Sequence, residues 1–180
     1  MKADLIILTE TWLNDSDVNS KNYQLEEYAA KLNIVGRGRG IASYFSKMFR
    51  HVEKINCEGF SLSKFESEKL VVIGIYRSQE GNVTRLIAEL ELLMNDKKTT
   101  VIGGDLNICV LAYPQNHVTQ SLREMGFKQL VKRSTHIERG LLDHVYLREG
   151  KTSKVTHKIE EFPKYYSDHD GVGLILTELE

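Results

Sequence analysis

The sequence has little of what marks secreted, membrane-spanning or linker-rich chains. It contains two cysteines and two prolines among 180 residues. Cys57 and Cys109 lie far apart, which excludes a disulfide framework and a paired-cysteine metal knuckle. No run of about 18 apolar residues is present, so we expect no membrane partner. The residues after Met1 lack the small-residue cleavage site of a secretory signal, and we expect an intracellular protein with reduced thiols.

An excess of charge of one sign is also missing. The chain has 24 Lys and Arg residues against 25 Asp and Glu residues, a net charge of -1. Because the whole protein has no field that would attract a polyanion, nucleic-acid binding must rest on local basic patches. Such patches are offered by Arg37, Arg39, Lys47, Arg50 and Lys54, and by Lys128, Lys132, Arg133 and Arg139. An ordinary solvated surface is the alternative interpretation of both groups.

What is present indicates one α/β domain over residues 1–180, with no low-complexity linker and no internal repeat. Short β-branched runs bounded by polar residues or glycine predict buried strands. These runs are 5–8, 70–76 and 99–102, with weaker strand patterns at 40–45, 141–147 and 171–176.

Two segments have helical character. Apolar residues recur at helical spacing from Val83 to Met94 after a possible N-cap, Asn82. A second helix is predicted from about Asn116 to Met125, with Gly126 ending it.

The glycine-rich segment 36–40 is not one of the usual phosphate-binding loops. It lacks both the GK[ST] ending and the GxGxxG spacing. Two interpretations stay open: a turn before a strand, or a loop whose arginines contact phosphates.

Four polar clusters follow or precede predicted strands, where separate segments can present a rigid set of side chains. Each cluster alone is weak, because a Gly-Asp pair or a lone Glu after a strand is usually a turn or a solvated group. The clusters are Thr9-Glu10-Thr11, Gly104-Asp105-Leu106-Asn107, Leu142-Asp143-His144 and Ser167-Asp168-His169-Asp170.

Taken together and in this order, the clusters resemble the motifs of the endonuclease/exonuclease/phosphatase superfamily, which includes DNase I. The strand-end glutamate, GD[LF]N, LDH and SDH patterns of that superfamily match the four clusters in turn. The resemblance covers nearly the whole chain and is greatest to endonuclease domains of non-LTR retrotransposons. The segments that carry this closer likeness are 40–45, 75–77, 126–131 and 141–145.

The resemblance implies a DNase I-like two-sheet α/β sandwich flanked by helices, and a metal-dependent endonuclease that hydrolyses DNA. A phosphodiester resists attack because it is anionic, so a catalyst must neutralise developing charge and position a water molecule. Mg²⁺, or Mn²⁺ in its place, suits this role because it accepts carboxylates and keeps positions for water and phosphate.

The resemblance also assigns roles to residues. Glu10 and Asp168 are expected to bind the metal, and Asp105 and Asn107 to orient water and a phosphate oxygen. Asp143 is expected to pair with His169, which either accepts a proton or donates a hydrogen bond to the phosphate. The remaining expectations are that Tyr76 donates to a phosphate oxygen, unless it is a core aromatic, and that Arg37, Arg39 and Arg77 contact nucleic acid.

The chain departs from the superfamily at its start, since the usual first strand, with an asparagine near the metal, is absent. We therefore expect an unpaired sheet edge and a weakened metal site. Other phosphoesterases of the superfamily, exonuclease or phosphatase, and an inactive retroelement-derived remnant are the alternative functions. An endonuclease of this kind would work in the nucleus with a fused or separate reverse transcriptase.

Overall fold

The computed structural model describes residues 2–17, 21–35, 39–151, 154–163 and 167–179. Its strands are β1 (Leu5–Thr9), β2 (Ala29–Asn33), β3 (Ile41–Phe45), β4 (Arg50–Cys57), β5 (Phe60–Glu66), β6 (Leu70–Arg77), β7 (Thr99–Asp105), β8 (Lys128–Gln129), β9 (Asp143–Arg148), β10 (Val155–Phe162) and β11 (Gly171–Glu178). Its helices are α1 (Val83–Leu93), α2 (His117–Glu124) and the 3-10 turns η1 (Asp15–Asp17) and η2 (Lys21–Tyr23). Within the described ranges, no helix has the length and apolar character needed to cross a membrane.

The larger of the sheets has six strands in the order β4-β5-β6-β7-β9-β8. β6 and β7 run parallel and are connected through α1, whereas the other neighbouring pairs are antiparallel. β6 is buried on both faces, which explains why its sequence is a nearly continuous apolar run.

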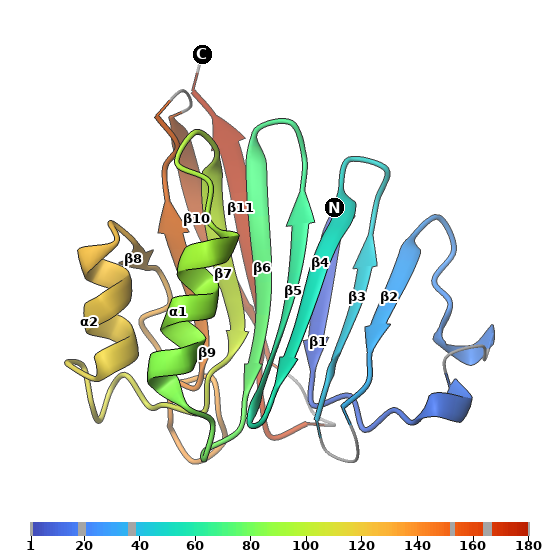
Figure 1. Cartoon of the computed structure of the whole chain (residues 1–180), viewed down its shortest axis with the longest axis horizontal. Coiled ribbons are helices and arrows are strands. Elements are labelled where there is room, and N and C mark those ends of the chain that lie inside the picture. The colour runs from blue at the N-terminus through green and yellow to red at the C-terminus, as the bar shows by residue number, and fades with distance from the viewer. Residues whose placement is uncertain (1, 18–20, 36–38, 152–153, 164–166, 180) are drawn as a thin grey trace.

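A second layer packs on one face of the six-stranded sheet. It consists of the three-stranded sheet β1-β3-β2 and the hairpin β10-β11, both antiparallel. Figure 1 shows β1, β10 and β11 behind the six-stranded sheet, with α1 and α2 in front of it. The fold is therefore the expected α/β sandwich flanked by helices. Among the described residues, β1 pairs with β3 alone and β11 with β10 alone, so each has one open edge.

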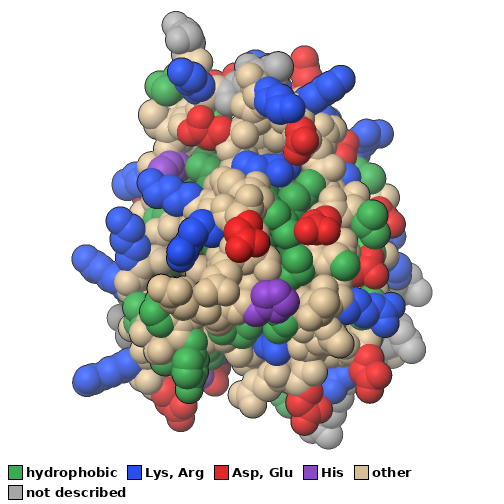
Figure 2. Space-filling model, turned by 60° about the vertical axis from the view of Figure 1, so that its left-hand side comes forward, with side chains coloured by type: hydrophobic (Ala, Val, Ile, Leu, Met, Phe, Trp, Pro, Cys, Tyr) green, Lys and Arg blue, Asp and Glu red, His purple; other side chains and the backbone are tan. Residues whose placement is uncertain are grey.

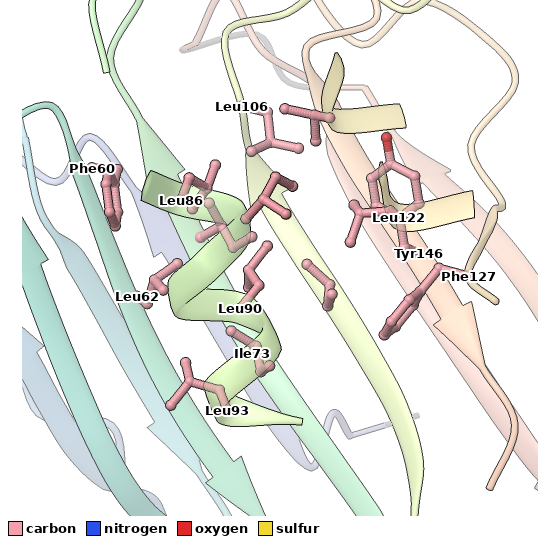
Figure 3. Packing of buried hydrophobic residues seen from close by; sticks show 14 of the residues in the cluster. Phe60, Leu62, Ile73, Leu86, Leu90, Leu93, Leu106, Leu122, Phe127 and Tyr146 are labelled. Carbon is pink, nitrogen blue, oxygen red and sulfur yellow. The ribbon is translucent and has the colours of Figure 1, made fainter. Parts of the chain in front are cut away.

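Two apolar cores form on the two faces of the six-stranded sheet, because alternate residues of a strand point to opposite faces. In β6, Ile73 and Ile75 belong to the core beneath the helices, and Val72 to the core between the layers. Figure 3 shows Leu86, Leu90 and Leu93 of α1 lying over the sheet. The helix-side core also contains Leu122 of α2, Phe127 and Tyr146.

Both predicted helices are confirmed, together with their caps. The Asn82 side chain accepts a hydrogen bond from Arg85 N at 2.9 Å and begins α1. The Asn116 side chain accepts one from Thr119 N at 3.0 Å and begins α2. Gly126, with φ of +86°, follows α2 in the left-handed conformation that commonly ends a helix.

The six predicted strands correspond to β1, β3, β6, β7, β9 and β11, with ends displaced by a few residues. β2, β4, β5, β8 and β10 were not predicted. β4 and β10 have mostly polar side chains on exposed positions, so their sequences lack an apolar run. β5 is almost wholly buried, but its serines and lysine interrupt the apolar pattern.

Candidate active site

The predicted site residues lie where the two layers end together. In the six-stranded sheet, Tyr76 at the end of β6 pairs with Asp105 at the end of β7, and Asp105 pairs with Asp143 at the start of β9. Glu10 directly follows β1 in the second layer, and His169 lies shortly before β11. The strand pairings thus bring three of these residues together, and the side-chain contacts of Glu10 with Tyr76 and of His169 with Asp143 add the other two at the same end of the sandwich.

Glu10 and Tyr76 join the two layers at this edge. The Tyr76 hydroxyl donates a 2.8 Å hydrogen bond to Glu10 Oε1. Burial, followed by this bond to the carboxylate, raises the pKa of Tyr76. The aromatic ring is buried, so Tyr76 is both a core residue and a site residue. The hydroxyl proton is therefore directed at Glu10 in this structure, and its donation to a phosphate oxygen stays a prediction.

Asp105 is the last residue of β7, and Asn107 lies in the loop that follows. Asn107 donates to Asp105 from its backbone N (2.9 Å to Oδ1) and from its Nδ2 (3.2 Å to Oδ2). Burial raises the pKa of Asp105 to about 7, and the neighbouring carboxylates Asp143 and Glu10 act in the same direction. At Gly104 φ is +142°, and a Cβ there would collide with the Ile75 carbonyl oxygen, so glycine is required just before Asp105.

Backbone strain accompanies two of these side chains. Glu10 and Asn107 both have φ of 49°, in the left-handed region that non-glycine residues rarely occupy. Asparagine tolerates this region, but for glutamate it is unusual. Strained residues of this kind cluster at functional sites, where the surrounding structure holds them in place.

Asp143 and His169 form a carboxylate-histidine pair. His169 Nδ1 lies 2.8 Å from Asp143 Oδ2, and this hydrogen bond raises the pKa of His169 to about 9. Asp143 is itself held by Thr135, whose buried Oγ1 accepts a bond from Asp143 N at 3.1 Å. The neighbouring His144 is different: it is buried between Tyr146 and the Ile108 carbonyl, which makes it a structural residue.

Asp168 lies at the exposed rim, where it meets a residue that the sequence did not indicate. Asp168 Oδ2 is 3.5 Å from His136 Nε2, and the Asp168 side chain is 68% exposed. An isolated antiparallel bridge pairs His136 with His169. His136 follows no predicted strand and belongs to no recognisable motif, so only this tertiary pairing identifies it as a site neighbour.

The structure corrects the expectation for Arg77. Its guanidinium is buried and donates to three backbone carbonyl oxygens: Gly81 at 2.9 Å, Leu106 at 3.0 Å and Gln79 at 2.9 Å. The Arg77 carbonyl in turn accepts from Asn107 Nδ2 at 2.8 Å. Arg77 therefore has no free face for nucleic acid and instead holds the Asp105–Asn107 loop against the end of β6.

Replacing Arg77 with alanine should lower the free energy of unfolding by about 2–4 kcal/mol, because three backbone carbonyls, two of them in buried contacts, would lose their donor. Arg77→Lys should restore little of this, since an ammonium group cannot satisfy three divergent acceptors. Denaturant titration measures the effect, with the exposed Arg85→Ala on α1 as the matched control. An equal and small loss in all three variants would contradict this role.

Of the other two arginines expected to contact nucleic acid, the structure describes Arg39 but not Arg37. Arg39 is exposed, and its positive charge acts to lower the pKa of Tyr76, so it lies near the site. Elsewhere, the face shown in Figure 2 has Lys and Arg side chains interspersed with Asp and Glu. Contact of Arg39 with a phosphate stays a prediction.

The donor set at this edge suits a hard divalent cation. The Asp105 carboxylate interacts electrostatically with the carboxylates of Glu10 and Asp143. The Asp168 carboxylate interacts with the His169 ring. Asp143 and Glu10 act to raise the pKa of Asp105, and an added cation would relieve that repulsion. Oxygen ligands of this kind fit Mg²⁺ or Mn²⁺.

No family model and no curated protein sequence matches the chain. Solved structures do. An apurinic/apyrimidinic endonuclease from Archaeoglobus fulgidus is 14% identical with a TM-score of 0.70, over 96% of this chain and 88% of that one. The endonuclease domain of TRAS1, a telomere-specific non-LTR retrotransposon, is 11% identical with a TM-score of 0.68, over 96% and 84%. D. rerio TDP2 complexed with a single-stranded DNA product is 13% identical with a TM-score of 0.66, over 97% and 86%.

These similarities span nearly the whole described chain at low sequence identity. They establish that the chain has a DNase I-like fold, as the motif resemblance implied. A fold hosts many activities, so function has to be argued from the site.

Proposed function

We propose that this protein is a divalent-metal-dependent endonuclease that hydrolyses phosphodiester bonds of DNA. The observation that supports it most is the meeting of three pairs at one sandwich edge: Glu10 with Tyr76, Asp105 with Asn107, and Asp143 with His169. The structural neighbours include DNA-processing nucleases, which favours DNA over other phosphate esters.

In this proposal Glu10 and Asp168 hold Mg²⁺, with Mn²⁺ as a substitute. The bound ion would neutralise charge on the phosphoryl oxygens and on the leaving oxygen. Tyr76 orients Glu10 by binding one carboxylate oxygen, which leaves the other oxygen for the cation. Asp168 is exposed at the rim and can turn towards the ion without disturbing the core.

The remaining residues act on water and phosphate. Asp105, whose pKa is raised to about 7, is suited to accept a proton from the attacking water near neutral pH. Asn107 holds both Asp105 oxygens, which fixes the direction in which the base points. Asp143 fixes the ring of His169 and favours its charged form, so His169 is suited to donate a hydrogen bond to an anionic phosphate oxygen.

Nicking of supercoiled plasmid by the purified chain tests the proposal. We expect conversion to open circles with Mg²⁺ or Mn²⁺, none with EDTA, and a strongly reduced rate for Asp168→Ala. Nicking that persists in EDTA, or an Asp168→Ala variant as active as the wild type, would contradict the proposed metal site. Hydrolysis of a small phosphate ester without plasmid nicking would point to another phosphoesterase of the same fold.

Tyr76→Phe should lower the affinity for Mg²⁺ or the nicking rate by about 10–100-fold, because a residue that orients a metal ligand contributes on that scale. The ring packing is retained, so the melting temperature should change little. Titration of the nicking rate with Mg²⁺ separates the two effects: a lost orienting bond raises the Mg²⁺ concentration needed for half-maximal rate. An unchanged titration curve would show that the hydroxyl does not position Glu10.

A further inference from the structure

His136, Asp168 and His169 form a cluster on the rim of the site that has its own coordination chemistry. The potential ligand atoms of the three side chains all lie within 4.8 Å of one another. The two imidazole rings meet edge to face, with centroids 4.8 Å apart. His136 has no part in the proposed hydrolysis, so its position beside His169 calls for a separate explanation.

The backbone holds the two histidines together. Ile137 N donates to Asp168 O at 2.8 Å, and Asp170 N donates to Thr135 O at 2.7 Å. These bonds lie on either side of the bridge between His136 and His169. The histidine backbones are therefore fixed relative to each other, whereas the exposed Asp168 side chain is free to adjust.

We propose that His136, Asp168 and His169 bind a borderline transition-metal ion such as Zn²⁺ at a site that shares Asp168 with the proposed Mg²⁺ site, and that this ion inhibits the nuclease. The inhibitory part rests on the proposed function, but the binding part does not.

The donor set selects the class of ion. Two imidazole nitrogens and one carboxylate oxygen form a common Zn²⁺ ligand set that leaves a fourth position for water. Mg²⁺ prefers oxygen ligands, so it should favour the carboxylates around Glu10 instead. Tetrahedral ligands about 2.1 Å from Zn²⁺ lie about 3.4 Å from one another, so the cluster has to contract slightly.

The surroundings of His169 resemble those of a metal-binding histidine. Its Nδ1 is bonded to Asp143, which leaves Nε2 as the nitrogen that can bind an ion. A carboxylate on the far ring nitrogen fixes the tautomer of a histidine ligand and makes it a better donor. When the ion binds, the proton on His169 Nε2 is released to solvent.

His136 presents its Nε2 to Asp168, at 3.5 Å. Its Nδ1 accepts a bond from Glu138 N at 3.2 Å, so in the ion-free state the ring proton is on Nε2, facing Asp168. Ion binding moves that proton to Nδ1 and gives up the long bond from Glu138. Binding therefore exchanges two contacts of His136, with Glu138 N and with Asp168, for one coordinate bond.

Zn²⁺ would inhibit the nuclease because the zinc cluster and the proposed catalytic site have two residues in common. Asp168 and His169 each have a role in the proposed reaction, and a bound Zn²⁺ would withdraw both from it. His136 would thus act as the residue that makes the site sensitive to zinc.

Direct binding of Zn²⁺ to the whole metal-stripped chain tests the site without reference to activity. We expect calorimetry to show one Zn²⁺ per chain, and Co²⁺ to give the visible absorption of a four-coordinate site. His136→Gln, which keeps a polar side chain of similar size, should weaken binding by about 10-fold or more. His157→Gln, an exposed histidine on β10, is the matched control and should bind as the wild type does.

Absence of a Zn²⁺ site, or equal affinity in the wild type and His136→Gln, would overturn the proposal. A melting curve shows that His136→Gln is folded, and should His136→Gln fail to fold, His136→Asn replaces it. In the nicking assay with Mg²⁺, each variant is compared with its own zinc-free rate. His136→Gln should need about 10-fold more Zn²⁺ for half-inhibition, and equal inhibition of both proteins would refute the inhibitory role.

Discussion

Replacing His169 with alanine should lower the rate of DNA strand cleavage by about 100-fold or more, because a positioned acid, base or donor typically contributes on that scale. His169 precedes β11 and is only partly buried, so its removal leaves both apolar cores untouched. The fold should persist, with Asp143 still held through its backbone by Thr135.

The measurement needs both the single-turnover nicking rate and a melting curve. His157→Ala, at an exposed position on β10, is the control for loss of an imidazole and should retain full activity. His144→Ala is an informative contrast, since burial lowers the pKa of His144 to about 4 and its ring bonds lie within the core. That variant should lose stability first. An active His169→Ala protein, or one inactive only because it unfolds, would refute the assigned role.

Replacing Asp105 with asparagine should make the protein more stable at neutral pH and nearly abolish cleavage. Asp105 is 2% exposed, and burial raises its pKa from 3.8 to about 7. A shift of about three pKa units corresponds to at most about 4 kcal/mol. The gain should be smaller, about 1–3 kcal/mol, because an asparagine amide facing Asn107 Nδ2 loses one hydrogen bond.

The pH dependence has a definite sign. Because the folded protein holds the Asp105 proton more tightly than the unfolded chain, this group makes the protein less stable as the pH rises from about 4 to about 7. Above that range its effect is constant. The difference in unfolding free energy between Asp105→Asn and the wild type should therefore grow from near zero at pH 4 to its full value above pH 7.

Urea titrations at several pH values, in EDTA to exclude bound metal, measure this difference. Glu149→Gln, an exposed carboxylate after β9, is the control and should show no such trend. Asp105→Asn is expected both to stabilise the fold and to remove activity, because the buried Asp105 charge costs folding free energy but is needed for the reaction. A destabilised Asp105→Asn protein at pH 8 would show that the carboxylate is stabilised in the fold and that this account of the base is wrong.

Several features of this protein followed from local sequence. The spacing from Val83 to Met94 and the capping asparagines 82 and 116 predicted both helices, since these signals act within one or two turns. Strands buried on both faces, such as β6, were also recognisable, because a short apolar run is what such an environment requires. The four motif clusters gave the positions of Glu10, Asp105, Asp143 and His169.

Edge strands and buried polar groups were beyond local prediction. β4 and β10 expose most of their side chains, and their pairing depends on partners that supply the hydrogen bonds rather than on their own hydrophobicity. Arg77 looked like a free cation in the sequence, yet its three carbonyl acceptors come from the turn after β6 and the loop after β7.

The sequence by itself determined which residue types are available for metal and phosphate chemistry, and placed each at a strand end. Only the tertiary structure decided how they combine. The pairing of β6, β7 and β9 sets Tyr76, Asp105 and Asp143 side by side, and the stacking of the second layer brings Glu10 to Tyr76. An isolated backbone bridge pairs His136 with His169, although the two residues are more than 30 positions apart in the sequence. Contacts this distant in sequence leave no periodic trace, because they depend on how whole sheets pack rather than on the spacing of residues within one strand.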